Sequence, residues 1–181
     1  MKRISTISIG LLLASTASYA DHFYTTDPKG ELAKQAGMAY EGIAAHVYPV
    51  RVAGTTPMFR WFNKESGDHF YTTAANGEDA LKAGHRAEGI GFYCYATPQA
   101  NTVPLYRWFN ATHAVHFYTT VADGELARKE DYKSEGIACH VHSKPEPGTT
   151  PLYRWYLRNY KGGASCNWVP SAPWQINFDC K

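Results

Sequence analysis

Histidine, tyrosine, glutamate and tryptophan recur in this chain at a fixed spacing of 47 residues. Each repeat carries the histidine and tyrosine in His-Phe-Tyr-Thr-Thr, the glutamate in Glu-Gly-Ile and the tryptophan in Arg-Trp. Flat aromatic surfaces beside a few placed polar groups are what a sugar-binding site needs. The candidate ligand-binding residues are therefore His22, Tyr24, Glu41, Trp61, His69, Tyr71, Glu88, Trp108, His116, Tyr118, Glu135 and Trp155.

The same positions also have a packing interpretation, which the sequence leaves open. In a strand, a histidine and the tyrosine two residues later share one face, so both would be core residues bonded to a neighbouring repeat. The glutamates of Glu-Gly-Ile would then form ion pairs with the repeated arginines inside each unit. Those arginines are Arg60, Arg107 and Arg154.

Catalysis and metal binding receive little support from the sequence. The chain has no Gly-x-Ser-x-Gly, His-Glu-x-x-His or phosphate-binding loop motif. The repeated glutamates are equivalent, whereas a glycosidase needs two carboxylates in different environments. Three histidines converging on an axis would suit zinc, but nothing places these strands on an axis. We expect no catalytic residue, no metal and no cofactor, and three equal sites suited to multivalent binding.

The repeats extend well beyond these motifs, since 15 of 47 positions are identical in all three copies. Each copy reads as strand, short helix, strand, loop and strand. In the first copy the strands are expected at 22–26, 41–47 and 58–62, with about two helical turns at 30–36. The glycine of Glu-Gly-Ile indicates a bulge or a close backbone approach in the second strand.

The phase of the repeats predicts a closed fold. No Leu-Tyr-Arg-Trp strand precedes the first His-Phe-Tyr strand, and the missing strand appears at 152–156. We expect it to pair with the first strand, because a linear array would leave unpaired edges. The predicted fold is mainly β with short helices (α+β). It is a closed, trefoil- or prism-like assembly with three-fold pseudo-symmetry, closed by the C-terminal strand.

The ends of the chain indicate export and disulfide bonding. Residues 1–20 have a basic start, a short apolar run and small residues before a cleavage site, as in a secretory signal peptide. We expect a secreted or periplasmic protein with a three-repeat domain at 21–157, in units of about 21–67, 68–114 and 115–157. The four cysteines allow three pairings, and the simplest of them links Cys166 to Cys180 in the tail at 158–181 and Cys94 to Cys139.

The motifs resemble a family of repeats of unknown function found in secreted bacterial and fungal proteins. The similarity covers about residues 21–157, in pieces such as Leu105–Asn110 (Leu-Tyr-Arg-Trp-Phe-Asn), His116–Thr120 and Glu135–Ala138. Members are often appended to secreted cell-wall hydrolases such as muramidases. The resemblance implies an extracellular accessory module for glycan or cell-surface attachment. This chain differs in carrying no hydrolase, and its third copy has Leu157 where the motif has asparagine.

Charge and composition exclude several other functions. The chain has 18 basic and 16 acidic residues, and removal of the leader takes Lys2 and Arg3, which leaves 16 of each. A neutral chain lacks the clustered charge that nucleic acids and anionic membranes attract, and no segment is long enough for membrane insertion. The leading hypothesis is a non-enzymatic, lectin-like module for cell-wall or cell-surface glycans. The alternatives are a structural envelope or matrix protein and a small glycan hydrolase.

Overall fold

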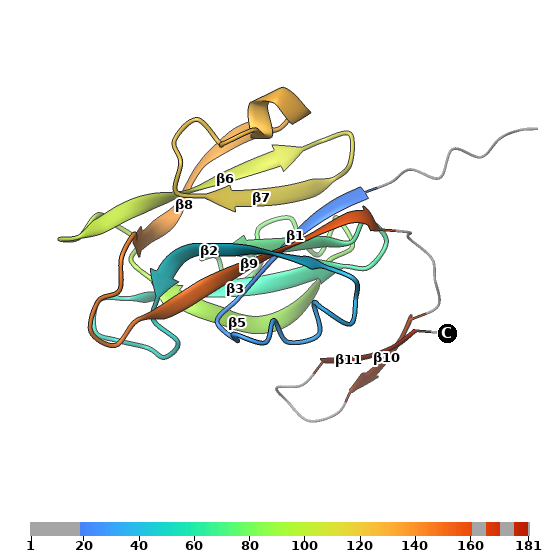
Figure 1. Ribbon diagram of the computed structural model, residues 1–181, viewed down its shortest axis with the longest axis horizontal. Coiled ribbons are helices and arrows are strands. Elements are labelled where there is room, and N and C mark those ends of the chain that lie inside the picture. The colour runs from blue at the N-terminus through green and yellow to red at the C-terminus, as the bar shows by residue number, and fades with distance from the viewer. Residues whose placement is uncertain (1–18, 161–165, 171–175, 181) are drawn as a thin grey trace, which may run out of the picture.

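The computed structural model describes the backbone of residues 19–160, 166–170 and 176–180, and the side chains of residues 21–157. The fold is mainly β, and its strands curve into a nearly closed, barrel-like arrangement (Figure 1). Within the described residues the only helix is the short 3-10 helix η1 (Ala127–Glu130). The predicted β class is confirmed.

Nine strands form three antiparallel groups that share one motif order. In each group an Arg-Trp strand lies between a His-Phe-Tyr strand and a Glu-Gly-Ile strand. The first group is β1 (Tyr19–Thr25), β9 (Thr150–Tyr160) and β2 (Ala39–Val47). The second is β4 (Asp68–Thr72), β3 (Thr56–Asn63) and β5 (Arg86–Cys94). The third is β7 (Val115–Thr119), β6 (Thr102–Asn110) and β8 (Lys133–His142).

The first group joins the two ends of the repeat region. Strand β1 pairs with β9 along its length, so that His22 lies opposite Tyr156. This is the pairing that the phase of the repeats predicts. Single bridges in or next to the Glu-Gly-Ile strands link the groups. These bridges are His46–His142, Tyr48–Tyr93 and Tyr95–His140. The bridge between β2 and β8 joins the first and third groups into a six-stranded sheet in the order β1-β9-β2-β8-β6-β7, and the second group is a three-stranded sheet.

The core is divided into one central cluster and three outer ones. The central cluster takes residues from all three groups, among them Tyr24, Met58 and Leu105, each at most 1 % exposed. Each outer cluster is built around one repeated tryptophan, at most 8 % exposed, and a phenylalanine of the neighbouring His-Phe-Tyr strand. The repeated aromatic residues of the His-Phe-Tyr and Arg-Trp motifs therefore lie in the interior.

The predicted short helices are wrong, because the backbone turns left-handed where each was expected to start. Gly30 and Glu31 both have positive φ, at 74° and 51°, and the same pair of angles recurs in the other two copies. Residues in this region interrupt a right-handed helix. The segments from Gly30, Gly77 and Gly124 are therefore turns, with the single 3-10 turn η1 in the third copy.

The predicted bulges are present. The register of β2 against β9 shifts between Tyr40 and Gly42, and β5 and β8 shift at the equivalent places against β3 and β6. Gly42 adopts φ of 119°, which a residue with a Cβ rarely adopts. The glutamate at each bulge contacts the repeated arginine of the adjacent strand in its own group.

The predicted Cys94–Cys139 disulfide is confirmed, and it joins β5 to β8. In the tail, β10 (Cys166–Pro170) pairs with β11 (Ile176–Cys180), and the register places Cys166 opposite Cys180. The side chains of this pair lie outside the described residues, so the second disulfide stays a prediction. Most of the predicted leader, residues 1–18, also lies outside them.

The packing of Gly30 on Trp155 gives a test of the outer clusters. A Cβ at Gly30 would overlap the indole ring, whereas a Cβ at Gly37 would meet only Leu157 at 3.9 Å. Both glycines have positive φ, so both alanine variants carry backbone strain. Gly30→Ala should lose about 1–3 kcal/mol more unfolding free energy than Gly37→Ala, from overpacking alone. Equal losses in urea titrations would contradict this packing.

Candidate functional site

Three buried tyrosines form a ring of hydrogen bonds at the centre of the molecule. The ring consists of Tyr24, Tyr71 and Tyr118, one from each His-Phe-Tyr strand, and each is 1 % exposed. The Tyr71 hydroxyl donates to the carbonyl of Tyr24 at 2.8 Å and accepts from the amide of Tyr24 at 2.9 Å. The Tyr118 hydroxyl makes the same two hydrogen bonds with the backbone of Tyr71, and the Tyr24 hydroxyl makes them with the backbone of Tyr118.

This tyrosine ring satisfies the backbone at three strand edges. Each His-Phe-Tyr strand is bonded to an Arg-Trp strand on one side only. A buried amide or carbonyl left without a partner is costly, and the hydroxyl of the next tyrosine supplies both partners at once. The rings meet edge to face, with centroids 5.4–5.7 Å apart. The three candidate tyrosines are thus structural contacts between strand groups.

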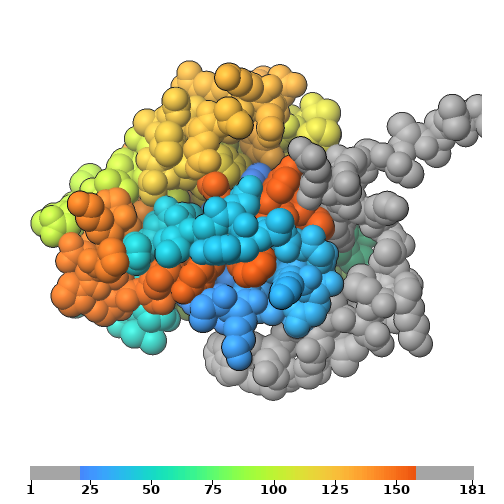
Figure 2. Space-filling view, viewed as in Figure 1, coloured from blue at the N-terminus to red at the C-terminus, as the bar shows by residue number. Residues whose placement is uncertain are grey.

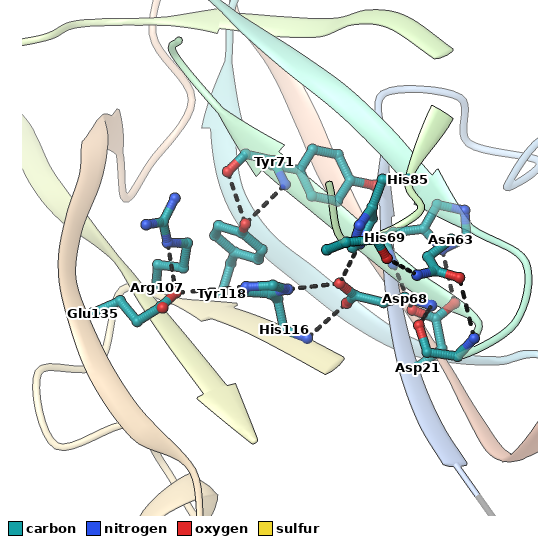
Figure 3. A network of polar contacts seen from close by, with 12 residues as sticks. Asp21, Asn63, Asp68, His69, Tyr71, His85, Arg107, His116, Tyr118 and Glu135 are labelled. Atoms are coloured by element: carbon teal, nitrogen blue, oxygen red, sulfur yellow. Dashed lines mark hydrogen bonds and ion pairs between the residues drawn. The ribbon is translucent and has the colours of Figure 1, made fainter. Parts of the chain in front are cut away.

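The repeated histidines also lie between strand groups, and two of them are held by buried aspartates. The His69 ring and backbone amide contact Asp21 at 2.8 and 3.2 Å. The His116 ring and amide contact Asp68 at 2.6 and 2.7 Å. Asp68 also contacts the ring of His85 at 2.8 Å, so two imidazoles converge on one carboxylate (Figure 3).

These contacts set the charge of the buried groups. Burial alone would lower the pKa of His116, but Asp68 and Glu135 raise the pKa to about 9. Burial likewise opposes ionisation of Asp68, and the two histidines that face it nevertheless hold its pKa below the ordinary value. The pKa of His69 is also raised, because the attraction of Asp21 outweighs burial. His116 is therefore protonated at neutral pH, and the contact with Asp21 favours the protonated form of His69.

Each repeated arginine lies between two glutamates. Arg60 forms two hydrogen bonds with Glu31 at 2.7 and 3.1 Å, and its Nε lies 2.8 Å from Glu88. Arg107 is held in the same way by Glu78 and Glu135, and Arg154 by Glu125 and Glu41. We name these places the Arg60, Arg107 and Arg154 junctions.

The predicted arginine–glutamate pairs exist, but they cross the predicted unit boundaries. Arg60 pairs with Glu88 of the next sequence copy, because β3 and β5 belong to one strand group. The other glutamate, which forms two hydrogen bonds with the arginine, comes from a different strand group. These second glutamates are absent from the candidate residues of the sequence analysis. The signal that could have found them is the Gly-Glu pair, which is identical in all three copies. The second glutamates are Glu31, Glu78 and Glu125.

The Arg154 junction lacks the buried aspartate of the other two. Val115 stands where the repeat has Asp21 and Asp68, and it is 0 % exposed. Among the described residues, Nδ1 of His22 therefore finds no hydrogen-bond partner. Burial lowers the pKa of His22 to about 3, and Arg154 adds to this effect. This histidine is neutral at the pH where His116 is charged.

Two hollows lie at the junctions. The larger, about 190 Å³, is lined at the Arg154 junction by Glu41, Gly42, Ile43, Ala44, Thr119, Thr120, Val121, Glu125 and Arg154. The smaller, about 60 Å³, is lined at the Arg60 junction mainly by apolar side chains together with Glu31, Arg60, His69 and Glu88. In Figure 2, β2 crosses the visible face beside the yellow to orange residues near 120–130, the two sides of the larger groove.

The structure distributes the sequence candidates between the interior and the junctions. The repeated tryptophans and tyrosines are buried, and the histidines are at most 12 % exposed at the side chain. The glutamates Glu41 and Glu135 reach the surface, with side chains 30 % and 34 % exposed, whereas Glu88 is 9 % exposed. The three histidines lie at three separate junctions. No group of acidic, histidine or cysteine residues suited to a metal ion occurs in the described part of the chain.

The comparisons with known proteins place the chain in a family. A family model described as "Domain of unknown function (DUF5648)" matches residues 13–141 and 95–166. These matches cover more than half of the chain, so the protein belongs to this family. No curated protein and no solved structure matches. Within the described residues, no helix is long and apolar enough to span a bilayer.

The aspartate–histidine pairs predict how stability depends on pH. The folded pKa of His116, about 9, lies above the ordinary histidine pKa of 6.5. Its contribution is therefore fully present below about pH 6.5 and is lost as pH rises through 9. We expect the unfolding free energy from urea titrations to fall between pH 6.5 and 9.5. His116→Gln should make this decline shallower, and an unchanged slope in that variant would contradict the assignment.

Proposed function

We propose that this chain is a non-enzymatic, carbohydrate-binding module that is secreted or periplasmic and recognises cell-wall or cell-surface glycans. The observation that carries the proposal is the groove at the Arg154 junction. Thr120 and the partly exposed Glu41 and Glu125 offer hydroxyl and carboxylate oxygens at its surface. Ile43 and Val121 are 51 % and 45 % exposed at its walls and supply an apolar surface.

This groove suits a sugar for general chemical reasons. Sugar hydroxyls pair with carboxylates and guanidinium groups, while the C–H faces of the ring prefer apolar contacts. A volume of about 190 Å³ is smaller than the roughly 300–1,000 Å³ of sites for drug-sized ligands. The binding site proposed here is the surface of the Arg154 junction, because the repeated aromatic residues are buried.

The scaffold that we propose for this module has three-fold pseudo-symmetry. The cyclic tyrosine contacts, the three Glu-Arg-Glu sets and the common strand order support this arrangement. In this scaffold, two carboxylates hold each arginine in one orientation, so the arginine is preorganised for a ligand. The paired glutamates are fixed by the same contacts.

Two observations bear on the alternatives. Burial of the repeated tyrosines and tryptophans favours a purely structural envelope or matrix protein, because these residues are then needed only for packing. Hydrolysis of a glycan needs an acid and a base facing each other across the scissile bond. Glu41 and Glu125 instead contact a single guanidinium at 3.0 and 2.8 Å, which favours binding over catalysis.

Filling the groove tests the proposal. We expect the folded protein to co-sediment with at least one insoluble cell-wall polysaccharide and to release no new reducing ends from it. Thr120→Trp should weaken this association roughly tenfold by occupying the groove. The matched control is Thr73→Trp, at the equivalent position of the preceding copy, with thermal melts for both variants. If the folded parent binds no polysaccharide, the structural-protein alternative becomes the better account.

A further inference from the structure

The three junctions share their arginine and glutamates but differ at two positions that surround the arginine. The first is the buried acid of the aspartate–histidine pair, which is Asp21, Asp68 and then Val115 in the three copies. The second is the residue after His-Phe-Tyr-Thr-Thr, which is Asp27, Ala74 and then Val121. At the Arg154 junction, the first change removes a buried carboxyl group and the second adds an apolar surface.

The loss of the aspartate changes the carboxyl group in the groove. At the Arg107 junction, the hydrogen bond from His116 lowers the pKa of Glu135. At the Arg154 junction, His22 is neutral and lies 3.7 Å from Glu41. Burial and the nearby Glu125 then raise the pKa of Glu41 against the attraction of Arg154. The equivalent glutamates thus differ in how readily they hold a proton.

The charged and titratable groups around this pair come from several elements. Those acting on Glu41 are Arg154, Glu125, Glu130 and His22. Those acting on His22 are Arg154, Glu125, Asp68 and Glu41. Arg154 is the single cation among them, and two neighbouring glutamates share it, so the groove offers no excess positive charge to an anionic ligand.

The second change gives the groove its apolar wall. Val121 and Ile43 are both exposed and both line the groove. The equivalent of Val121 at the Arg60 junction is Asp27, whose carboxylate instead accepts hydrogen bonds from the amides of Lys29 and Glu31. Only the Arg154 junction therefore combines an exposed valine with an exposed isoleucine beside the arginine.

We propose that the Arg154 junction is the single ligand site of the chain and that it takes one uncharged sugar ring. This inference rests on the proposed function and replaces three equal sites by one. Ile43 and Val121 cover the apolar face of the ring, and Glu41, Glu125 and Thr120 bind its hydroxyl groups. An acidic sugar is disfavoured, because its carboxylate would face two glutamates.

The isoleucine of Glu-Gly-Ile provides a matched set of variants. Ile43, Ile90 and Ile137 are 51 %, 47 % and 52 % exposed, so alanine at any of them should leave the fold intact. The probes are cello-, manno- and chito-oligosaccharides, with oligogalacturonides as the acidic control, in NMR titrations of backbone amides. We expect one site per chain with shifts centred on Gly42 and Thr120. Ile43→Ala should weaken binding roughly tenfold, and the other two variants should leave it unchanged.

Equal weakening by all three isoleucine variants, or three sites per chain, would overturn the single-site inference and leave glycan binding standing. Binding of the acidic oligomer alone would overturn the ligand class. Absence of binding to every probe by the folded parent would overturn the proposed function and this inference together.

A second measurement needs no ligand. In histidine NMR titrations of the parent, His22 should stay neutral from pH 5 to 8, while His116 stays protonated over most of that range. Val115→Asp restores the missing partner and should make His22 titrate in the manner of His116. If His22 and His116 titrate alike in the parent, the junctions are equivalent and the inference fails.

Discussion

The structure depends on one interaction, in which a tyrosine hydroxyl replaces a neighbouring strand. Each hydroxyl of the tyrosine ring accepts from an amide and donates to the carbonyl of the same residue in the next strand group. An edge strand in a protein interior would otherwise leave these groups unpaired. Because each group satisfies the next, none of the three can leave the ring without breaking the contacts of both neighbours.

Outside the tyrosine ring, the three zones of contact between strand groups, which contain the Arg60, Arg107 and Arg154 junctions, are polar. All three zones contain a repeated histidine, which is paired with an aspartate in two of them, and an arginine with its two glutamates. Phenylalanines of the His-Phe-Tyr strands pack under the guanidinium groups at 5.0–5.3 Å from the ring centroids. Ion pairs in such partly buried positions mainly fix geometry, and here they fix the orientation of the groups that line the surface groove.

Much of the fold follows from the sequence, because repetition constrains it strongly. The pairing of β1 with β9 was predicted from the phase of the repeats, and the bulge at Gly42 from a glycine inside a strand. The helices were mispredicted because Glu31 adopts a positive φ. A glutamate rarely does so, and here the bidentate contact with Arg60, made across two strand groups, accompanies this conformation. Such a long-range cause leaves no local signal.

The candidate site was predicted less well than the fold. Repetition marked Tyr71 and Trp61 but could not distinguish a buried contact from an exposed one, since packing and binding both repeat residues. The residues that separate the Arg154 junction from the others, Val115 and Val121, are departures from the repeat. Identity among the copies does not mark such departures. Their effect follows only from the positions of His22 and of the groove at the Arg154 junction.

Native-state hydrogen exchange at the amides of the tyrosine ring tests the account most directly. The amides of Tyr24, Tyr71 and Tyr118 donate to hydroxyl groups of neighbouring strand groups. If the ring holds all three groups together, these amides exchange only through global unfolding, with one common free energy that falls equally with denaturant. Exchange of any one of them through a local opening, several kcal/mol below the global value, would contradict the ring as the central constraint.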